Sequence, residues 1–83
     1  MIDYRGVAVL SEISSHWNYV ARNSLGKLKI YTHMPFIDND THDVVTIIGN
    51  VGDLSMMDNG AFDFIKIGQI ELISQYTYKN YRK

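Results

Sequence analysis

The side chains that could carry catalysis in this chain are its histidines and serines. Imidazole can bind a metal or act as a general base near neutral pH, but His16, His33 and His42 are separated by 17 and 9 residues, which matches no metal-ligand pattern. The chain has no Cys, and no serine sits in a Gly-x-Ser-x-Gly elbow. We therefore expect a protein that is not an enzyme, with no catalytic residue, no metal site and no cofactor.

Carboxylates gather around His42. Asp38 and Asp40 stand at alternate positions, as in the opening of an EF-hand calcium loop. Such a loop also needs a Gly at its sixth position and a bidentate acid at its twelfth, where this chain has Asp43 and Gly49. We therefore expect an acidic turn without metal, and a metal-dependent enzyme built around His42 is the weakest of three functional hypotheses.

Acidic residues are concentrated in the middle of the chain. The net charge is −1, yet the segment 37–65 contains no Lys or Arg and carries −6, whereas the rest of the chain carries +5. The acidic members are Asp38, Asp40, Asp43, Asp53, Asp58 and Asp63. Turns favour Asp, which explains these positions but not the missing basic residues. Because an acidic surface is steered toward a basic groove, we predict that the six aspartates bind a protein partner.

Basic and aromatic residues suggest a second function. They alternate along a predicted strand and recur near the C-terminus: Lys27, Lys29, Tyr31, Tyr78, Tyr81, Arg82 and Lys83. Aromatic rings stack on bases and cations pair with phosphates, so these residues could bind single-stranded RNA or DNA. The sequence pI of about 6.2 is lower than that of a typical nucleic-acid binder. A single-stranded RNA- or DNA-binding domain is therefore the alternative hypothesis.

The length of 83 residues allows one domain, residues 1–83, with a small core. Without Cys it has no disulfide to stabilise it, so we predict a homodimer that forms through an exposed sheet edge or the Tyr-rich final strand. The chain contains neither a secretory leader pattern nor an apolar run of about 20 residues. We therefore expect a cytoplasmic protein that does not bind membranes.

Apolar residues recur at helical spacing in the first third of the chain: Ile13, Trp17, Val20, Ala21 and Leu25. We predict a helix from about Ser11 to Leu25, ended by Gly26 and anchored in the core by Trp17. A strand is the competing interpretation, because apolar residues also alternate there. The pattern leaves open whether Gly6 to Leu10 is strand or helix.

Strand patterns follow the predicted helix. The expected strands are Lys27 to Met34, Val44 to Val51, Ala61 to Ile67 and Gln69 to Tyr78, with Val44 to Val51 central. In the first of them we expect Leu28 and Ile30 to face the core and Tyr31 to face solvent. Asn59-Gly60 is a hairpin signal.

These elements predict an α+β fold, with one N-terminal helix packed on a strongly bent antiparallel sheet of four to five strands that is small and open barrel-like. Residues 44–74 resemble the later strands of Sm-like or SH3-like barrels, although they match no motif residue of either family. A small domain of this kind, lacking catalytic groups, is typical of phage and mobile-element accessory proteins. The leading hypothesis is therefore a non-enzymatic inhibitor or adaptor that binds a protein with a basic surface.

Overall fold

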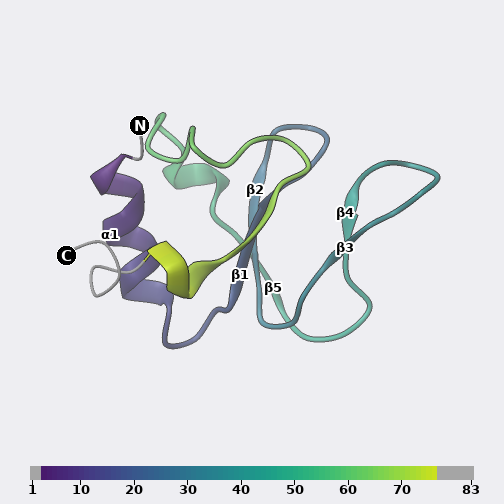
Figure 1. Ribbon diagram of the computed structural model, residues 1–83, viewed down its shortest axis with the longest axis horizontal. Coiled ribbons are helices and arrows are strands. Elements are labelled where there is room, and N and C mark those ends of the chain that lie inside the picture. The colour runs from purple at the N-terminus through teal and green to yellow at the C-terminus, as the bar shows by residue number, and fades with distance from the viewer. Residues whose placement is uncertain (1–2, 77–83) are drawn as a thin grey trace.

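The computed structural model describes residues 3–76, which form an α+β domain (Figure 1). The elements are α1 (Tyr4–Ile13), β1 (Tyr19–Arg22), β2 (Leu28–Tyr31), β3 (Phe36–Ile37), β4 (Val44–Val45), β5 (Val51–Asp53), the 3₁₀ turn η1 (Ser55–Met57), β6 (Ile70–Leu72) and the 3₁₀ turn η2 (Ile73–Tyr76). The predicted fold class is confirmed. In the described part of the chain the sheet is not closed into a barrel.

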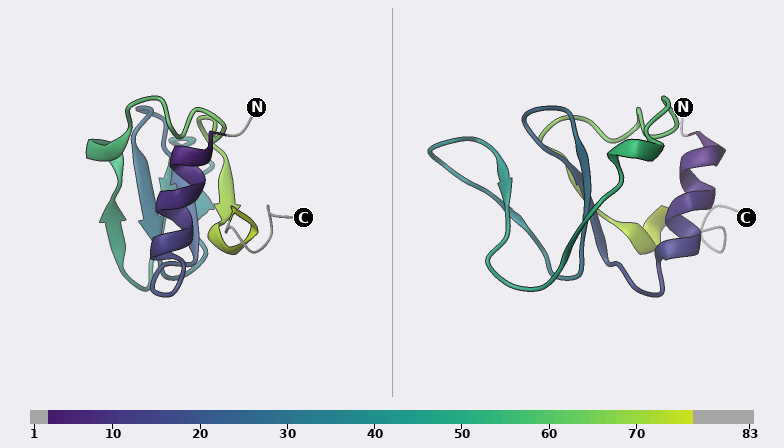
Figure 2. Two further views of the ribbon diagram at one scale, coloured as in Figure 1. Left: turned by 90° about the vertical axis from the view of Figure 1, so that its left-hand side faces the viewer. Right: turned by 180° about the vertical axis from the view of Figure 1, so that it is seen from behind.

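The main sheet has four antiparallel strands in the order β5-β2-β1-β6, and β3 pairs with β4 in a separate two-stranded sheet. The domain has three layers (Figures 1 and 2). The main sheet lies in the middle, α1 and η2 cover one of its faces, and the β3–β4 hairpin lies on its other side. We call residues 34–50, which contain this hairpin, the arm.

Two apolar clusters hold these layers together. The larger one lies between α1 and the sheet and includes Leu10, Val20, Leu28, Ile30, Phe62, Ile65 and Ile73. The smaller one joins Ala21 and Tyr31 of the sheet to Val44 of the arm. Tyr31 was predicted to face solvent, and this is wrong, because the arm covers the second face of the sheet.

The helix lies earlier in the chain than predicted. It begins after Asp3, whose carboxylate accepts a hydrogen bond from Arg5 N–H (2.8 Å), and it ends at Ile13. The prediction of a helix from Ser11 to Leu25 is wrong, since Tyr19–Arg22 pairs with Leu28–Tyr31 in the sheet. Residues 6–10, which the sequence left open, are helical.

Trp17 therefore does not anchor a helix. It lies half-buried in the connection between α1 and β1 and packs against the larger cluster. A Cβ atom at Gly52 of β5 would come within 3.1 Å of Trp17 Cη2, so this glycine lets the indole approach the strand closely. Gly6 has the same role in α1, because a Cβ there would collide with the carbonyl oxygen of Ala61.

Three of the predicted strands are wrong in extent. The run 44–51 is not a central strand: only Val44–Val45 pairs, in the arm, and β5 begins at Val51. Residues 61–67 form turns, with one isolated bridge between Ile67 and Arg22. The hairpin predicted at Asn59-Gly60 is therefore wrong, although Gly60 takes a positive φ of 92°. The last predicted strand is confined to Ile70–Leu72 and continues as η2.

Candidate interaction surface

The arm is a hairpin whose acidic tip is ordered by its own side chains. Phe36 pairs with Val45, and Asp38 N–H donates to the Asp43 carbonyl oxygen (2.8 Å). The Asp38 carboxylate then accepts from Asp40 N–H (2.8 Å), the turn geometry for which Asp is suited. His42 takes a positive φ of 59° in this turn. The tip therefore has a defined shape and presents Asp40 to solvent.

Asp43 and Val44, where the tip joins β4, fix the arm to the main sheet. The Asp43 carboxylate accepts hydrogen bonds from Ser24 N–H (3.1 Å), in the turn between β1 and β2, and from Val44 N–H (2.9 Å). The Ser24 bond, followed by the Val44 bond, lowers the pKa of Asp43 below its ordinary value of 3.8. Val44 packs on Tyr31, whose pKa is raised first by burial and second by Asp43.

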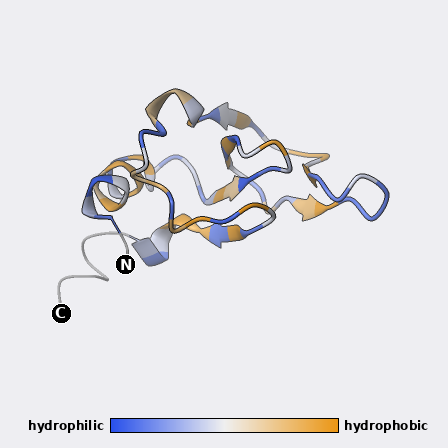
Figure 3. Ribbon diagram, turned by 90° about the horizontal axis from the view of Figure 1, so that it is seen from above, coloured by the Kyte–Doolittle hydropathy of each residue, from blue (hydrophilic) through white to orange (hydrophobic). Residues whose placement is uncertain are grey.

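The arm exposes a large amount of apolar surface for its size. Most of its large hydrophobic side chains are exposed: Met34, Phe36, Ile37, Ile47 and Ile48. Figure 3 shows hydrophobic strands beside a hydrophilic tip at this end of the molecule. An apolar patch with a polar rim is typical of a surface that binds another protein. The sequence did not indicate this patch, because an apolar run such as 44–51 also describes a buried strand.

The structure does not gather the six predicted aspartates on one surface. Asp38, Asp40 and Asp43 belong to the arm, whereas the segment 58–63 lies at the opposite end of the molecule, near the start of α1 (Figure 1). Asp58 forms an ion pair with Arg22 (2.8 Å), and the Asp53 carboxylate accepts a hydrogen bond from Ser55 N–H (2.8 Å) at the start of η1. The arm is thus the only place in residues 3–76 where three of these aspartates lie together.

The residues of the nucleic-acid hypothesis are only partly available. Tyr31 is buried under the arm and presents no ring face on which a base could stack. Lys29 lies 3.5 Å from the Asp53 carboxylate, and Lys27 is exposed. The other predicted residues, Tyr78, Tyr81, Arg82 and Lys83, lie outside the described residues.

The histidines do not come together with acids in a metal-binding group. No set of three or more His, Asp or Glu side chains within residues 3–76 is arranged to hold a metal ion. His33 Nδ1 lies 3.1 Å from Thr32 Oγ1, and His16 packs edge-on against Trp17 with ring centroids 5.9 Å apart. Within the same residues, no helix is long and apolar enough to cross a membrane.

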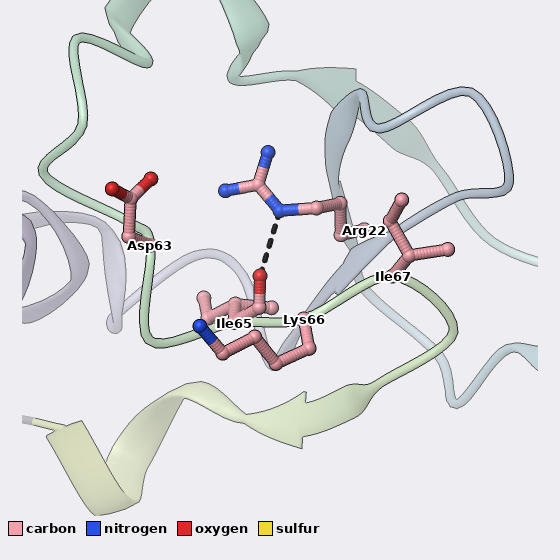
Figure 4. Close-up of a pocket in the computed structure, with 5 residues that line it drawn as sticks. All are labelled: Arg22, Asp63, Ile65, Lys66 and Ile67. Atoms are coloured by element: carbon pink, nitrogen blue, oxygen red, sulfur yellow. Dashed lines mark hydrogen bonds between the residues drawn. The ribbon is translucent and has the colours of Figure 1, made fainter.

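A shallow pocket of about 500 Å³ lies beside Arg22 and is lined by Arg22, Asp63, Ile65, Lys66 and Ile67 (Figure 4). The Arg22 guanidinium is engaged inside the protein: it donates to the carbonyl oxygens of Ile65 (2.6 Å), Phe62 (3.0 Å) and Gly26 (2.8 Å) and to Asp58. Its charge is balanced by that of Asp58. Arg22 therefore holds the turns of residues 58–67 in place.

No protein-family model, no curated protein and no solved structure matches this chain. Among the features of residues 3–76, the arm is the most distinctive, because it combines exposed apolar side chains with an acidic tip.

Acid should release the arm from the turn between β1 and β2. Because the folded pKa of Asp43 is lowered, its contribution to stability is complete above the ordinary value of 3.8 and is lost as the pH falls through the lower folded pKa. NMR shifts of the Ser24 and Val44 amides should follow this titration. An Asp43→Asn variant keeps the acceptor oxygen and should abolish the pH response. A midpoint at or above 3.8 would contradict the assignment.

Proposed function

We propose that this protein binds another protein through the arm and acts as an inhibitor or adaptor rather than as an enzyme. The single observation that supports this proposal is the combination of exposed apolar strands with an acidic tip on a hairpin that is anchored to the sheet. A two-stranded hairpin is at best marginally stable alone in water. Here the hydrogen bonds of Asp43 and the packing of Val44 fix the hairpin of the arm before a partner binds.

The two parts of the arm have different roles in this proposal. Phe36, Ile47 and Ile48 supply apolar area, which is the main source of affinity. Asp38 and Asp40, with no Lys or Arg in the arm, give the tip a negative field that speeds association with a basic partner. The partner is therefore a protein with an apolar groove that ends in a basic patch.

Photo-cross-linking in extracts of the native cells tests the proposal. A photoreactive residue at Ile47 in the arm should capture the partner, and one at the exposed Tyr4 of α1 should not. Equal capture from both positions would contradict the proposal. Capture that disappears after nuclease treatment would favour the nucleic-acid hypothesis instead.

Two variants then separate the apolar contribution to affinity from the electrostatic contribution to the association rate, both measured with the captured partner. Replacing Ile47 and Ile48 by Ser should weaken binding about tenfold or more, mainly through faster dissociation. Replacing Asp38 and Asp40 by Asn preserves the turn but should slow association and reduce its salt dependence. Ile67→Ser, an exposed apolar residue outside the arm, is the matched control and should bind normally. Normal binding by both arm variants would overturn the proposal.

A further inference from the structure

Strand β5 is an open edge of the main sheet. On the side that faces β2, two backbone hydrogen bonds flank the register pair Ile30 and Gly52. Thr32 N–H donates to the carbonyl oxygen of Asn50 (3.2 Å), and Leu54 N–H donates to that of Leu28 (3.0 Å). Alternate residues of an antiparallel strand bond to opposite neighbours, so the backbone groups of Val51 and Asp53 point away from β2. No described residue pairs with this side of β5.

This edge is short, with three residues, but it carries few of the side chains that block pairing at sheet edges. Proline, lysine, bulges and unpaired charges usually prevent a second chain from pairing there. The strand Val51–Asp53 contains neither Pro nor Lys, and Val51 is 50% exposed. Its one charged side chain, Asp53, forms an ion pair with Lys29 of β2 (3.5 Å). The edge can therefore accept another strand without burying an unpaired charge.

We propose that a second copy of this chain pairs antiparallel with β5, so that two four-stranded sheets join into one of eight strands. An antiparallel pair of identical strands is self-complementary, because a two-fold axis places the same edge on both sides of the interface. This proposal rests on β5 and its flanks and does not depend on the proposed function of the arm.

The charge on Asp53 and the direction of the backbone groups select the register. With Val51 opposite Asp53 of the second copy, both outward-facing residues of each chain form hydrogen-bonded pairs across the axis. Pairing Asp53 with its own counterpart would instead place two carboxylates opposite each other, which is unfavourable. The two-fold axis therefore passes between the Gly52 residues of the two copies.

The 3₁₀ turn that follows β5 supplies apolar surface beside the same edge. Met56 (89% exposed) and Met57 (49% exposed) lie in η1, three and four residues after Asp53. In an antiparallel pair the end of one strand meets the start of the other, so η1 of each copy comes to the end of the interface where β5 of its partner begins at the half-exposed Val51.

The symmetry also fixes the position of the arms. A two-fold axis that relates antiparallel strands within one sheet runs perpendicular to the sheet, so both helices lie on one face and both arms on the other. If the arm binds as proposed above, the dimer presents two arms in the same direction. Such a dimer can hold a partner with two sites more strongly than a single copy can, through the high effective concentration of the second arm.

Sedimentation equilibrium from about 1 to 500 µM tests the proposal, because a short interface of this kind predicts a dissociation constant in the micromolar range. The expected mass rises from 9.5 kDa toward twice that value. Val51→Lys adds a charge to the exposed edge and should raise the dissociation constant at least tenfold. Leu72→Lys, on the opposite edge strand β6, is the matched control and should dimerise normally. A monomer at every concentration, or dissociation by Leu72→Lys alone, would overturn the proposal.

Cysteine pairing tests the register in a chain that has no cysteine of its own. A mixture of Val51→Cys and Asp53→Cys proteins should form a disulfide-linked heterodimer several-fold faster than either protein forms a linked homodimer, since directly paired residues lie within disulfide reach. Circular dichroism of each variant confirms that it is folded. Equal rates in the mixture and in the separate proteins would exclude this register and with it the proposed interface.

Discussion

Replacing Arg22 by Met should lower the free energy of unfolding by about 3–5 kcal/mol, the cost of breaking a largely buried ion pair by removing one partner. The side chain of Arg22 is 12% exposed and that of Asp58 is 20% exposed. Methionine has a similar length but no donor. The change therefore leaves the Asp58 carboxylate unpaired and the carbonyl oxygens of Phe62 and Ile65 without the guanidinium that they accept from.

The size of this effect follows from the position of Arg22. It extends from β1 into a segment with little regular structure, and its bonds substitute for the ladder that a strand would have there (Figure 4). A domain of this length has a total stability of about 5–10 kcal/mol, so the variant should lose a large part of it. Urea unfolding followed by far-UV circular dichroism measures the loss.

Two further substitutions separate the charge of Arg22 from its geometry. Arg22→Lys keeps the charge but cannot donate in several fixed directions, so it should recover only a small part of the loss. Asp58→Asn keeps an acceptor for the guanidinium and should cost less than Arg22→Met. If Arg22→Met unfolds within about 0.5 kcal/mol of the parent, like an ordinary surface substitution, the network does not hold this segment.

The sequence predicted the class of the fold better than its elements. Alternation placed Leu28 and Ile30 on the core side of one strand, and the structure confirms it. The predicted helix was wrong because Trp17 and Ala21 fit both a helical and an alternating pattern. Pairing of β1 with β2 and β6, which is not visible in local spacing, decides between the two.

The candidate surface was predicted only in part. The acidic loop around Asp38 and Asp40 is a turn, as its composition indicates. The apolar side of the arm could not be predicted, because exposure of Ile47 and Ile48 depends on where the rest of the sheet lies. Likewise, whether the Asp58 carboxylate is paired depends on Arg22, which is 36 residues away in the chain. Charge segregation along a sequence does not show which charges are paired in space.

Replacing Phe62 by Ala should be about as costly as replacing Arg22. Phe62 is fully buried in the larger cluster, and its ring lies 6.4 Å from that of Phe64, which in turn packs 5.1 Å from Tyr76 of η2. Removing a buried Phe side chain costs about 3–5 kcal/mol, through lost apolar burial and the cavity left behind. Asp63→Ala, at the exposed neighbouring position, is the control and should change stability little.

The two costly substitutions should not be additive. The Arg22 guanidinium donates to the carbonyl oxygen of Phe62 (3.0 Å), so both residues hold the same turn against the sheet. Once Phe62→Ala has loosened this turn, loss of Arg22 has less native structure left to destabilise. The double variant should therefore lose about 1–3 kcal/mol less stability than the sum of the two single losses. Urea unfolding of the parent, the two single variants and the double variant measures this difference, at a low temperature at which each protein is folded before urea is added. Simple additivity would show that the polar network and the apolar core stabilise this segment independently.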